Sequence, residues 1–204
     1  MLQNEPTRRS REHVNGEDFS LALRTILSSR RHVSGHSVNA WATHAQVDAR
    51  SLGRYLMRGR SNRFEYAWRL GAALGLPVSL MVAEAISLAY RTGPEGRPHV
   101  KGSDYLPRSP ILHRVCILES GKATRALSQC LSIAVKNSGF SLARIAQKSG
   151  LSRPSLSRLG RLGRANHRLD YLFDLTLALS YPLDQLVREA EDVHLLPKPS
   201  TLEQ

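Results

Sequence analysis

The chain contains one segment twice. Residues 22–62 align without a gap with residues 126–166, and residues 63–85 align with residues 168–190 after one inserted residue, His167. More than a third of the aligned positions are identical, which far exceeds the similarity of unrelated segments and indicates that a small folding unit has been duplicated. Both copies are expected to fold alike, so one chain presents two versions of the same surface.

Length limits the architecture to two small units and their connections. A chain of 204 residues accommodates two cores of roughly 70 residues each, whereas one large core would leave the repeat unexplained. We expect a first unit over 17–92 and a second over 119–193, between a polar N-terminal tail (1–16) and a C-terminal tail (194–204). Glycine, proline and polar residues predominate in 93–118, which predicts an extended linker.

Composition indicates a folded protein of the cytoplasm. The hydrophobic fraction of 41% excludes wholesale disorder, and no apolar run approaches the ~20 residues that span a bilayer, so we expect no membrane contact. The N-terminal segment is polar and lacks the apolar stretch of a signal peptide. Two cysteines, Cys116 and Cys130, make no disulfide framework, and we expect both to be reduced thiols.

Glycine and serine residues divide the second copy into helices. Apolar residues at helical spacing, among them Leu127 and Leu131, predict a first helix over 122–137. Gly139 ends this helix, and Ser141 is placed to cap a second, shorter helix. The apolar edge of that second helix is expected to consist of Leu142, Ile145 and Ala146.

The third helix of the second copy follows a tight turn. Gly150 can adopt the left-handed conformation that such a turn requires. Ser152 is placed as the cap of the third helix. Pro154 follows in the first turn, where its missing backbone N–H would have no partner within the helix and therefore costs nothing. Two further apolar stretches, 169–180 and 182–192, complete a set of five predicted helices.

Arginines concentrate at the same place in both copies. The formal net charge is +12, and five arginines without any acidic residue lie in 49–64 and again in 153–169. One interpretation is a solvated basic face of an arginine-rich protein. Because the concentration recurs at the same place in both copies, we favour a surface that binds a polyanion. The ten arginines are Arg50, Arg54, Arg58, Arg60, Arg63, Arg153, Arg158, Arg161, Arg164 and Arg168.

The segment SLARIAQKSGLSRPSLSRLGRLG (141–163) resembles the DNA-binding domains of lambdoid-phage repressors and Cro, the XRE-type helix-turn-helix family. Small Ala146, turn-forming Gly150 and apolar Leu156 stand where the two helices of this motif approach, turn and lock together. The resemblance covers the whole second copy. It implies an all-α protein with two tandem five-helix helix-turn-helix domains, lambda repressor-like, joined by the extended linker.

The first copy takes the same assignment through the repeat, with two departures. Asp48 is placed to cap its third helix, and apolar stretches over 64–74 and 78–90 predict its fourth and fifth helices. Gln46 replaces the turn glycine, and a left-handed conformation costs a non-glycine residue roughly 1 kcal/mol. Gly53 lies in the exposed part of the third helix, where it lowers helix propensity.

Base contacts are expected from the third helix of each copy. In the helix-turn-helix this helix lies in the major groove of DNA with its first turns nearest the bases. Arginine can donate to both acceptors of guanine, and serine can reach either a base edge or a phosphate. The expected base-contacting residues are Arg50, Ser51, Arg54, Arg153, Ser155 and Arg158.

Phosphate contacts are expected around these helices. The resemblance implies that the segment after the third helix grips the DNA backbone, and both copies keep Gly-Arg-(Ser/Ala)-Asn there, at 59–62 and 163–166. Serine-capped helices also offer N-terminal amides to a phosphate. The expected phosphate-contacting residues are Ser37, Arg58, Arg60, Asn62, Arg63, Ser141, Arg161, Arg164, Asn166 and Arg168, with His167 as an accessory contact.

The linker permits both copies to bind one DNA molecule. A flexible coil of about 26 residues has a typical end-to-end distance of about 28 Å, comparable to the ~34 Å of one DNA turn. We therefore hypothesise that one chain is a covalent pseudo-dimer. Its half-sites are expected to differ, because Ala49 and Arg50 stand where the second copy has Arg153 and Pro154.

Signals for other functions are weaker. No second Cys/His pair stands at zinc-site spacing, and no activated nucleophile is evident, so we expect no metal, no cofactor and no enzymatic activity. Besides a DNA-binding regulator, most simply a repressor, two alternatives stay open. One is a nonspecific RNA-binding or nucleoid-type protein. The other is an antitoxin-like interaction protein or homodimer that binds its partner through the fifth helices, at Leu80, Met81, Val82, Ala85, Leu186, Val187 and Ala190.

Overall fold

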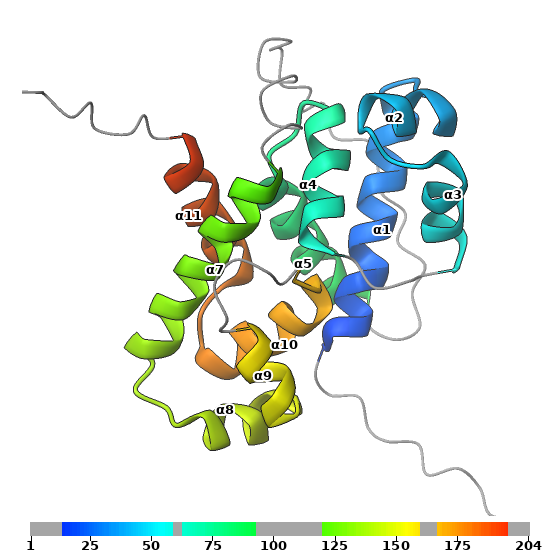
Figure 1. Cartoon of the computed structure of the whole chain (residues 1–204). Coiled ribbons are helices and arrows are strands. Elements are labelled where there is room, and N and C mark those ends of the chain that lie inside the picture. The colour runs from blue at the N-terminus through cyan, green and yellow to red at the C-terminus, as the bar shows by residue number, and fades with distance from the viewer. Residues whose placement is uncertain (1–13, 59–62, 93–119, 160–166, 196–204) are drawn as a thin grey trace, which may run out of the picture.

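The computed structural model of the chain is all-α (Figure 1). It describes residues 14–58, 63–92, 120–159 and 167–195, so the predicted linker lies outside the described residues. The first half comprises α1 (Gly16–Val33), α2 (Val38–His44), α3 (Ala49–Arg58), α4 (Phe64–Ala73) and α5 (Val78–Thr92). The second half comprises α7 (Ser120–Asn137), α8 (Leu142–Ser149), α9 (Arg153–Leu159), α10 (Leu169–Leu179) and α11 (Leu183–Leu195). Every helix of the first half begins at the residue that the repeat aligns with the start of its counterpart.

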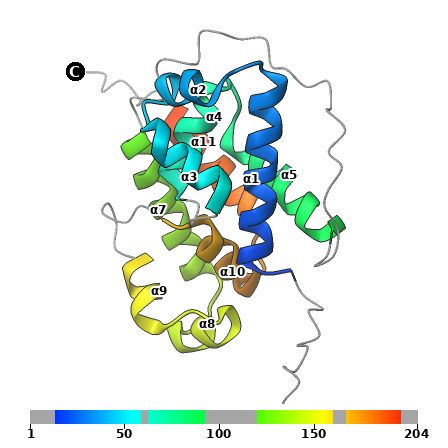
Figure 2. The ribbon, with the colours of Figure 1, turned by 90° about the vertical axis from the view of Figure 1, so that its right-hand side faces the viewer.

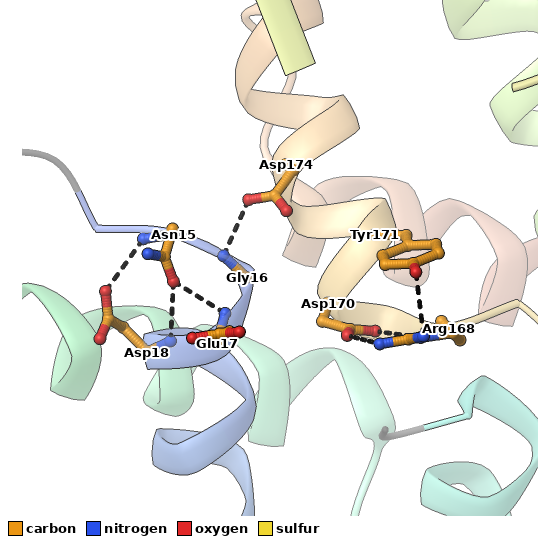
Figure 3. A network of polar contacts seen from close by, with 8 residues as sticks. All are labelled: Asn15, Gly16, Glu17, Asp18, Arg168, Asp170, Tyr171 and Asp174. Atoms are coloured by element: carbon orange, nitrogen blue, oxygen red, sulfur yellow. Dashed lines mark hydrogen bonds and ion pairs between the residues drawn. The ribbon is translucent and has the colours of Figure 1, made fainter. Parts of the chain in front are cut away.

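Polar side chains decide where the helices begin. Asn15 caps α1, because its side-chain oxygen accepts hydrogen bonds from the amides of Glu17 and Asp18 (Figure 3). The Asp18 carboxylate accepts from the Asn15 amide in return, which completes a capping box. The caps predicted for the short helices are also confirmed. Each accepts a hydrogen bond of 2.7–3.3 Å from the amide three residues on: Ser37, Asp48, Ser141 and Ser152.

The turns between the short helices are left-handed in both halves. Gly150 has φ of 68°, and Gln46, its counterpart, has φ of 53°, as the repeat predicts. The first half therefore keeps the same turn, although the left-handed conformation is less favourable for Gln46 than for a glycine. One detail of the predicted helix faces is wrong: Leu142 is 53% exposed, and Ile145 is the residue of α8 that is fully buried.

One hydrophobic core extends through both halves. Within each half the first helix packs on the fifth, α1 on α5 and α7 on α11. Between the halves α5 packs on α11, α1 on α10, and α4 on α7. The repeat pairs α1 with α7, α4 with α10 and α5 with α11. The contact of α1 with α10 is therefore equivalent to that of α7 with α4, and the contact of α5 with α11 is equivalent to itself. The halves are thus arranged like the subunits of a two-fold symmetric dimer.

The fifth helices meet at the centre of this arrangement. Their apolar side chains have no exposed surface, as found for Met81, Val82, Ala85, Leu186, Val187 and Ala190. For these six residues the prediction of a partner contact is corrected, because they are buried inside their own chain. The seventh, Leu80, is half-buried. The apolar surface of the fifth helix, which could join two separate chains that each had one copy, here joins the two copies within one chain.

Polar and aromatic contacts reinforce the joint between the halves. The buried Glu191 carboxylate of α11 accepts hydrogen bonds from the amides of Val78 (2.6 Å) and Ser79 (3.2 Å) and from the Ser79 hydroxyl, so it caps α5. On the other side, the rings of Phe19 and Phe173 stack with centroids 4.9 Å apart. The spacing of the halves is consequently set by direct contact, and the reach of a flexible tether does not determine it.

The most apolar helices of the first half lie in this core. In the described ranges no helix is by itself long and apolar enough to cross a bilayer, and α4 with α5 would reach that length only as a pair bent by 108°. Both helices bury their apolar residues against neighbouring helices, with Leu70 and Met81 wholly inaccessible. Their hydrophobicity is explained by packing within the chain.

A close approach of the two halves at Gly16 gives a stability test. A Cβ on Gly16 would lie 2.5 Å from the Asp170 carbonyl oxygen and 2.8 Å from the Asp174 carboxylate, whose other oxygen accepts from the Gly16 amide at 2.8 Å (Figure 3). Gly16→Ala is therefore expected to lower the free energy of unfolding by about 1–3 kcal/mol, measured by urea denaturation. Gly121→Ala is the control, because its Cβ would meet nothing within 4 Å in the first turn of α7. Equal stability of the two variants would contradict the contact.

Candidate nucleic-acid interface

Each half carries a pair of short helices joined by the left-handed turn, α2 with α3 and α8 with α9. The two pairs lie at the periphery of the molecule and are well separated in both views (Figures 1 and 2). Within each pair the helices pack on one another, and the earlier helix of the pair packs on the fourth helix of its own half. One face of α3 and one face of α9 are thereby left to solvent.

In the first half, α3 divides cleanly between core and solvent. Leu52 is fully buried and Tyr55 is 6% exposed, as expected for inward residues. Arg50 and Arg54 are exposed on the other side, where the Arg54 guanidinium donates to the Ser51 hydroxyl at 3.4 Å. The three residues predicted to contact bases therefore lie together on the free part of one helix.

The second half repeats this division on α9. Leu156 is 5% exposed and faces the core, whereas Arg153 is exposed in the first turn beside Pro154. Ser155 is half-buried, and its hydroxyl lies 2.9 Å from that of the capping Ser152. Arg153 is thus the cation of α9 whose side chain the structure describes. The Ser155 hydroxyl is within hydrogen-bonding distance of the hydroxyl of Ser152, the residue that caps α9.

Several predicted contacts lie outside the part of the chain that the structure describes. The side chains of Arg58 and Arg158 lie outside the described part, although their backbones belong to α3 and α9. The Gly-Arg-(Ser/Ala)-Asn segments that follow these helices in both copies also lie outside the described residues. They and their neighbours include Arg60, Asn62, Arg161, Arg164 and Asn166. Their phosphate contacts remain predictions.

The predicted phosphate contacts Arg63 and Arg168 meet where the halves join. They form an isolated antiparallel bridge, in which the Phe64 amide donates to the His167 carbonyl at 2.8 Å. Because the repeat aligns Arg63 with Arg168, this bridge lies near the pseudo-two-fold axis. The side chain of Arg63 is exposed.

The Arg168 side chain is held by its own helix (Figure 3). Its guanidinium donates to the Asp170 carboxylate and to the Tyr171 hydroxyl (3.0 Å), and it stacks 3.9 Å from the centre of the Tyr171 ring. The hydrogen bond to Asp170 raises the pKa of the guanidinium above its usual value. Asp170 offsets the charge of Arg168, whereas Arg63 is exposed, so Arg168 is the less suited of the two to the predicted phosphate contact.

His167 was expected on a phosphate, and this prediction is wrong. The imidazole is 1% exposed, and its Nε2 lies 2.6 Å from the Ser128 hydroxyl inside the second half. Burial lowers the pKa of the ring to about 4, so it is neutral at physiological pH. The inserted residue therefore serves packing, and its basic neighbours in the sequence gave a misleading signal.

The two halves differ in charge at the start of the third helix. Asp48 caps α3, and hydrogen bonds from the Ser51 hydroxyl and amide lower the pKa of its carboxyl below the ordinary value. Asp48 is exposed, so a negative charge lies beside Arg50. The second half has neutral Ser152 at this position. A polyanion would meet less repulsion at α9 than at α3.

Two exposed features near these helices were not predicted. Met57 of α3 is 87% exposed, which presents a flexible apolar side chain beside the arginines. In the second half, Arg144 and Lys148 of α8 lie 4.6 and 4.5 Å from the centre of the Phe140 ring. The spacing of four residues from Phe140 to Arg144 and on to Lys148 is the sequence signal that could have identified this group.

Within the described ranges, no group of three or more His, Cys, Asp or Glu side chains could hold a metal ion. Comparison of the chain with protein-family models, with curated proteins and with solved structures found no match.

The buried histidine predicts a specific pH dependence. The unfolded chain binds a proton at His167 below about pH 6.5, whereas the folded chain does so only near pH 4, so stability is lost as pH falls through this window. His167→Gln removes this titration. Between pH 6.5 and 4 the wild type is expected to lose about 3 kcal/mol more stability than the variant in urea denaturation. Equal losses in the wild type and in His167→Gln would show that the pKa of His167 is not lowered in the folded chain. The control is His32→Gln, a substitution at an exposed histidine, which is expected to lose stability in parallel with the wild type.

Proposed function

We propose that this chain is a sequence-specific double-stranded DNA-binding regulator, most simply a repressor, that acts as a covalent pseudo-dimer. In this proposal α2–α3 and α8–α9 are helix-turn-helix motifs, and each half is a five-helix domain of the lambda repressor-like type. The observation that carries the proposal is the duplicated pair of capped third helices, which bury leucine on one side and expose arginine on the other. Neither α3 nor α9 contains an acidic residue.

The exposed residues suit the major groove of DNA. The guanidinium groups of Arg50, Arg54 and Arg153 can each donate two hydrogen bonds to O6 and N7 of guanine. Met57 offers an apolar group to thymine methyls. The half-sites are expected to differ, because Arg50 follows an alanine in α3 whereas Arg153 precedes Pro154 in α9. One chain would then read an asymmetric operator.

Contact between the halves supports bivalent binding. Two binding units held at a set spacing lose little further freedom when the second one engages, which strengthens binding to a site of matching spacing. The same rigidity penalises sites of any other spacing. A regulator of this kind selects its operator by half-site distance as well as by base sequence.

The first experiment is selection of bound duplexes from a random library by the purified chain, at two salt concentrations. One asymmetric site with two unlike motifs at a constant spacing is expected. Binding without sequence enrichment that disappears as salt rises would indicate a nonspecific nucleic-acid binder instead. A folded chain that binds neither DNA nor RNA would indicate an interaction protein.

Arginine substitutions test which helix reads which motif. Arg54→Ala is expected to relax base preference in one motif and Arg153→Ala in the other, each lowering affinity for the selected site roughly 5- to 150-fold in gel-shift titrations. Arg188→Ala, an exposed arginine of α11, is the control and is expected to have little effect. If all three variants lose affinity equally and uniformly across sequences, the arginines act only through charge.

The acidic cap of α3 predicts a gain of affinity. Asp48→Ser copies Ser152, which keeps a capping oxygen and removes the negative charge beside Arg50. We expect roughly three- to tenfold tighter DNA binding at low salt and a smaller gain at high salt, with thermal stability nearly unchanged. The reciprocal variant Ser152→Asp is expected to weaken binding. Unchanged affinity in both would place the starts of α3 and α9 away from DNA.

A further inference from the structure

A pocket of about 180 Å³ lies in the second half, behind the short helices α8 and α9. Side chains from α7, α8, α9 and α10 line it: Leu131, Val135, Leu142, Ile145, Leu156 and Leu175. Ser132 and Lys136 complete the lining, so the pocket is apolar with one charge at its rim. The pocket is partly open to solvent, where Leu142 and Lys136 are exposed. Its volume is comparable to that of an apolar cavity of about 150 Å³ that binds benzene, so it has room for a small aromatic ligand.

The repeat shows which residues stand at the corresponding positions in the first half. Three lining leucines, Leu131, Leu156 and Leu175, align with Leu27, Leu52 and Leu70, which are fully buried. Ile145 aligns with Trp41. The Trp41 indole is fully buried, and its N–H donates a hydrogen bond to the Leu70 carbonyl at 3.1 Å. The first half therefore carries an indole at the position where the second has only a small branched side chain.

The smaller side chain leaves α8 packed less closely than α2. Ala42 of α2 is 1% exposed, whereas its counterpart Ala146 is half-buried. Likewise Val38 is half-buried, whereas its counterpart Leu142 is 53% exposed. An apolar cavity loses contacts along its walls, so a ligand that restores them is bound favourably.

We propose that this pocket binds a planar aromatic molecule of about the size of indole. The ligand takes the place that the Trp41 side chain has in the first half, against Leu131, Leu156 and Leu175. It joins α8 and α9 to α7 and α10 as the indole of Trp41 joins α2 to α4. Lys136, exposed at the rim, favours a ligand whose substituent is neutral or acidic over one that is basic.

Binding is tested with indole itself on the full chain, followed by amide NMR spectra. We expect saturable shifts confined to α7–α10, with a dissociation constant of about 1 mM or tighter. Absence of saturation, or shifts centred elsewhere in the chain, would overturn the proposal. The wild-type spectra alone decide this point, whether or not any variant folds.

Exchange of the aligned residues provides matched variants. Ile145→Trp is expected to fill the pocket, abolish indole binding and raise the melting temperature. Trp41→Ile is expected to open a second pocket in the first half and lower the melting temperature, which added indole partly restores. Indole binding that persists unchanged in Ile145→Trp would overturn the assignment of the site.

A regulatory role for the pocket rests on the proposed function. Because the ligand orders the helix that would enter the groove, saturating indole is expected to tighten binding to the selected duplex about fivefold or more, and to have no effect on Ile145→Trp. Unchanged DNA affinity with the pocket saturated would overturn this role. Failure to bind any DNA would overturn the proposed function instead, since the NMR titration decides the pocket without DNA.

Discussion

Packing of α5 against α11 holds the two halves together in one molecule. Six apolar side chains of α5 and α11 have no exposed surface, so separation of the halves would expose the centre of the core. At roughly 75 residues each half is near the lower limit for an independent hydrophobic core. Joining two such halves buries the surface that neither can cover alone. The Glu191 cap and the close approach at Gly16 follow from this docking, because both require helices of different halves to lie side by side.

A duplicated chain can change one copy while the other is kept. Three aligned pairs show this freedom: Asp48 with Ser152, Trp41 with Ile145, and Phe64 with Leu169. The first pair alters charge at the proposed DNA surface, and the second alters the packing behind it. In a homodimer each such change would appear in both subunits. Here the two halves can differ in surface charge and in side-chain packing without loss of the joint that holds them together.

Local features were predictable from the sequence to the level of single residues. The caps Ser37, Asp48, Ser141 and Ser152 and the left-handed turns at Gln46 and Gly150 depend on hydrogen bonds and backbone conformations within a few residues, and all are found. The errors concern longer distances. His167 sits among basic residues yet is buried, and the fifth helices look like an intermolecular surface yet close on each other. Nothing within a few residues of these positions reports which surface comes to cover them.

The duplication, the helical fold class, the approximate helix boundaries and the exposed positions of Arg50, Arg54 and Arg153 could be derived from the sequence alone. They depend on internal similarity, periodicity, capping and turn chemistry, which can be read along the chain. Three further features could not be read from the sequence: the docking of the halves, the cap that Glu191 provides for α5, and the pocket of the second half, where Ile145 stands in place of Trp41. These features arise from side chains far apart in the sequence. Their burial and pairing are defined only when the core closes.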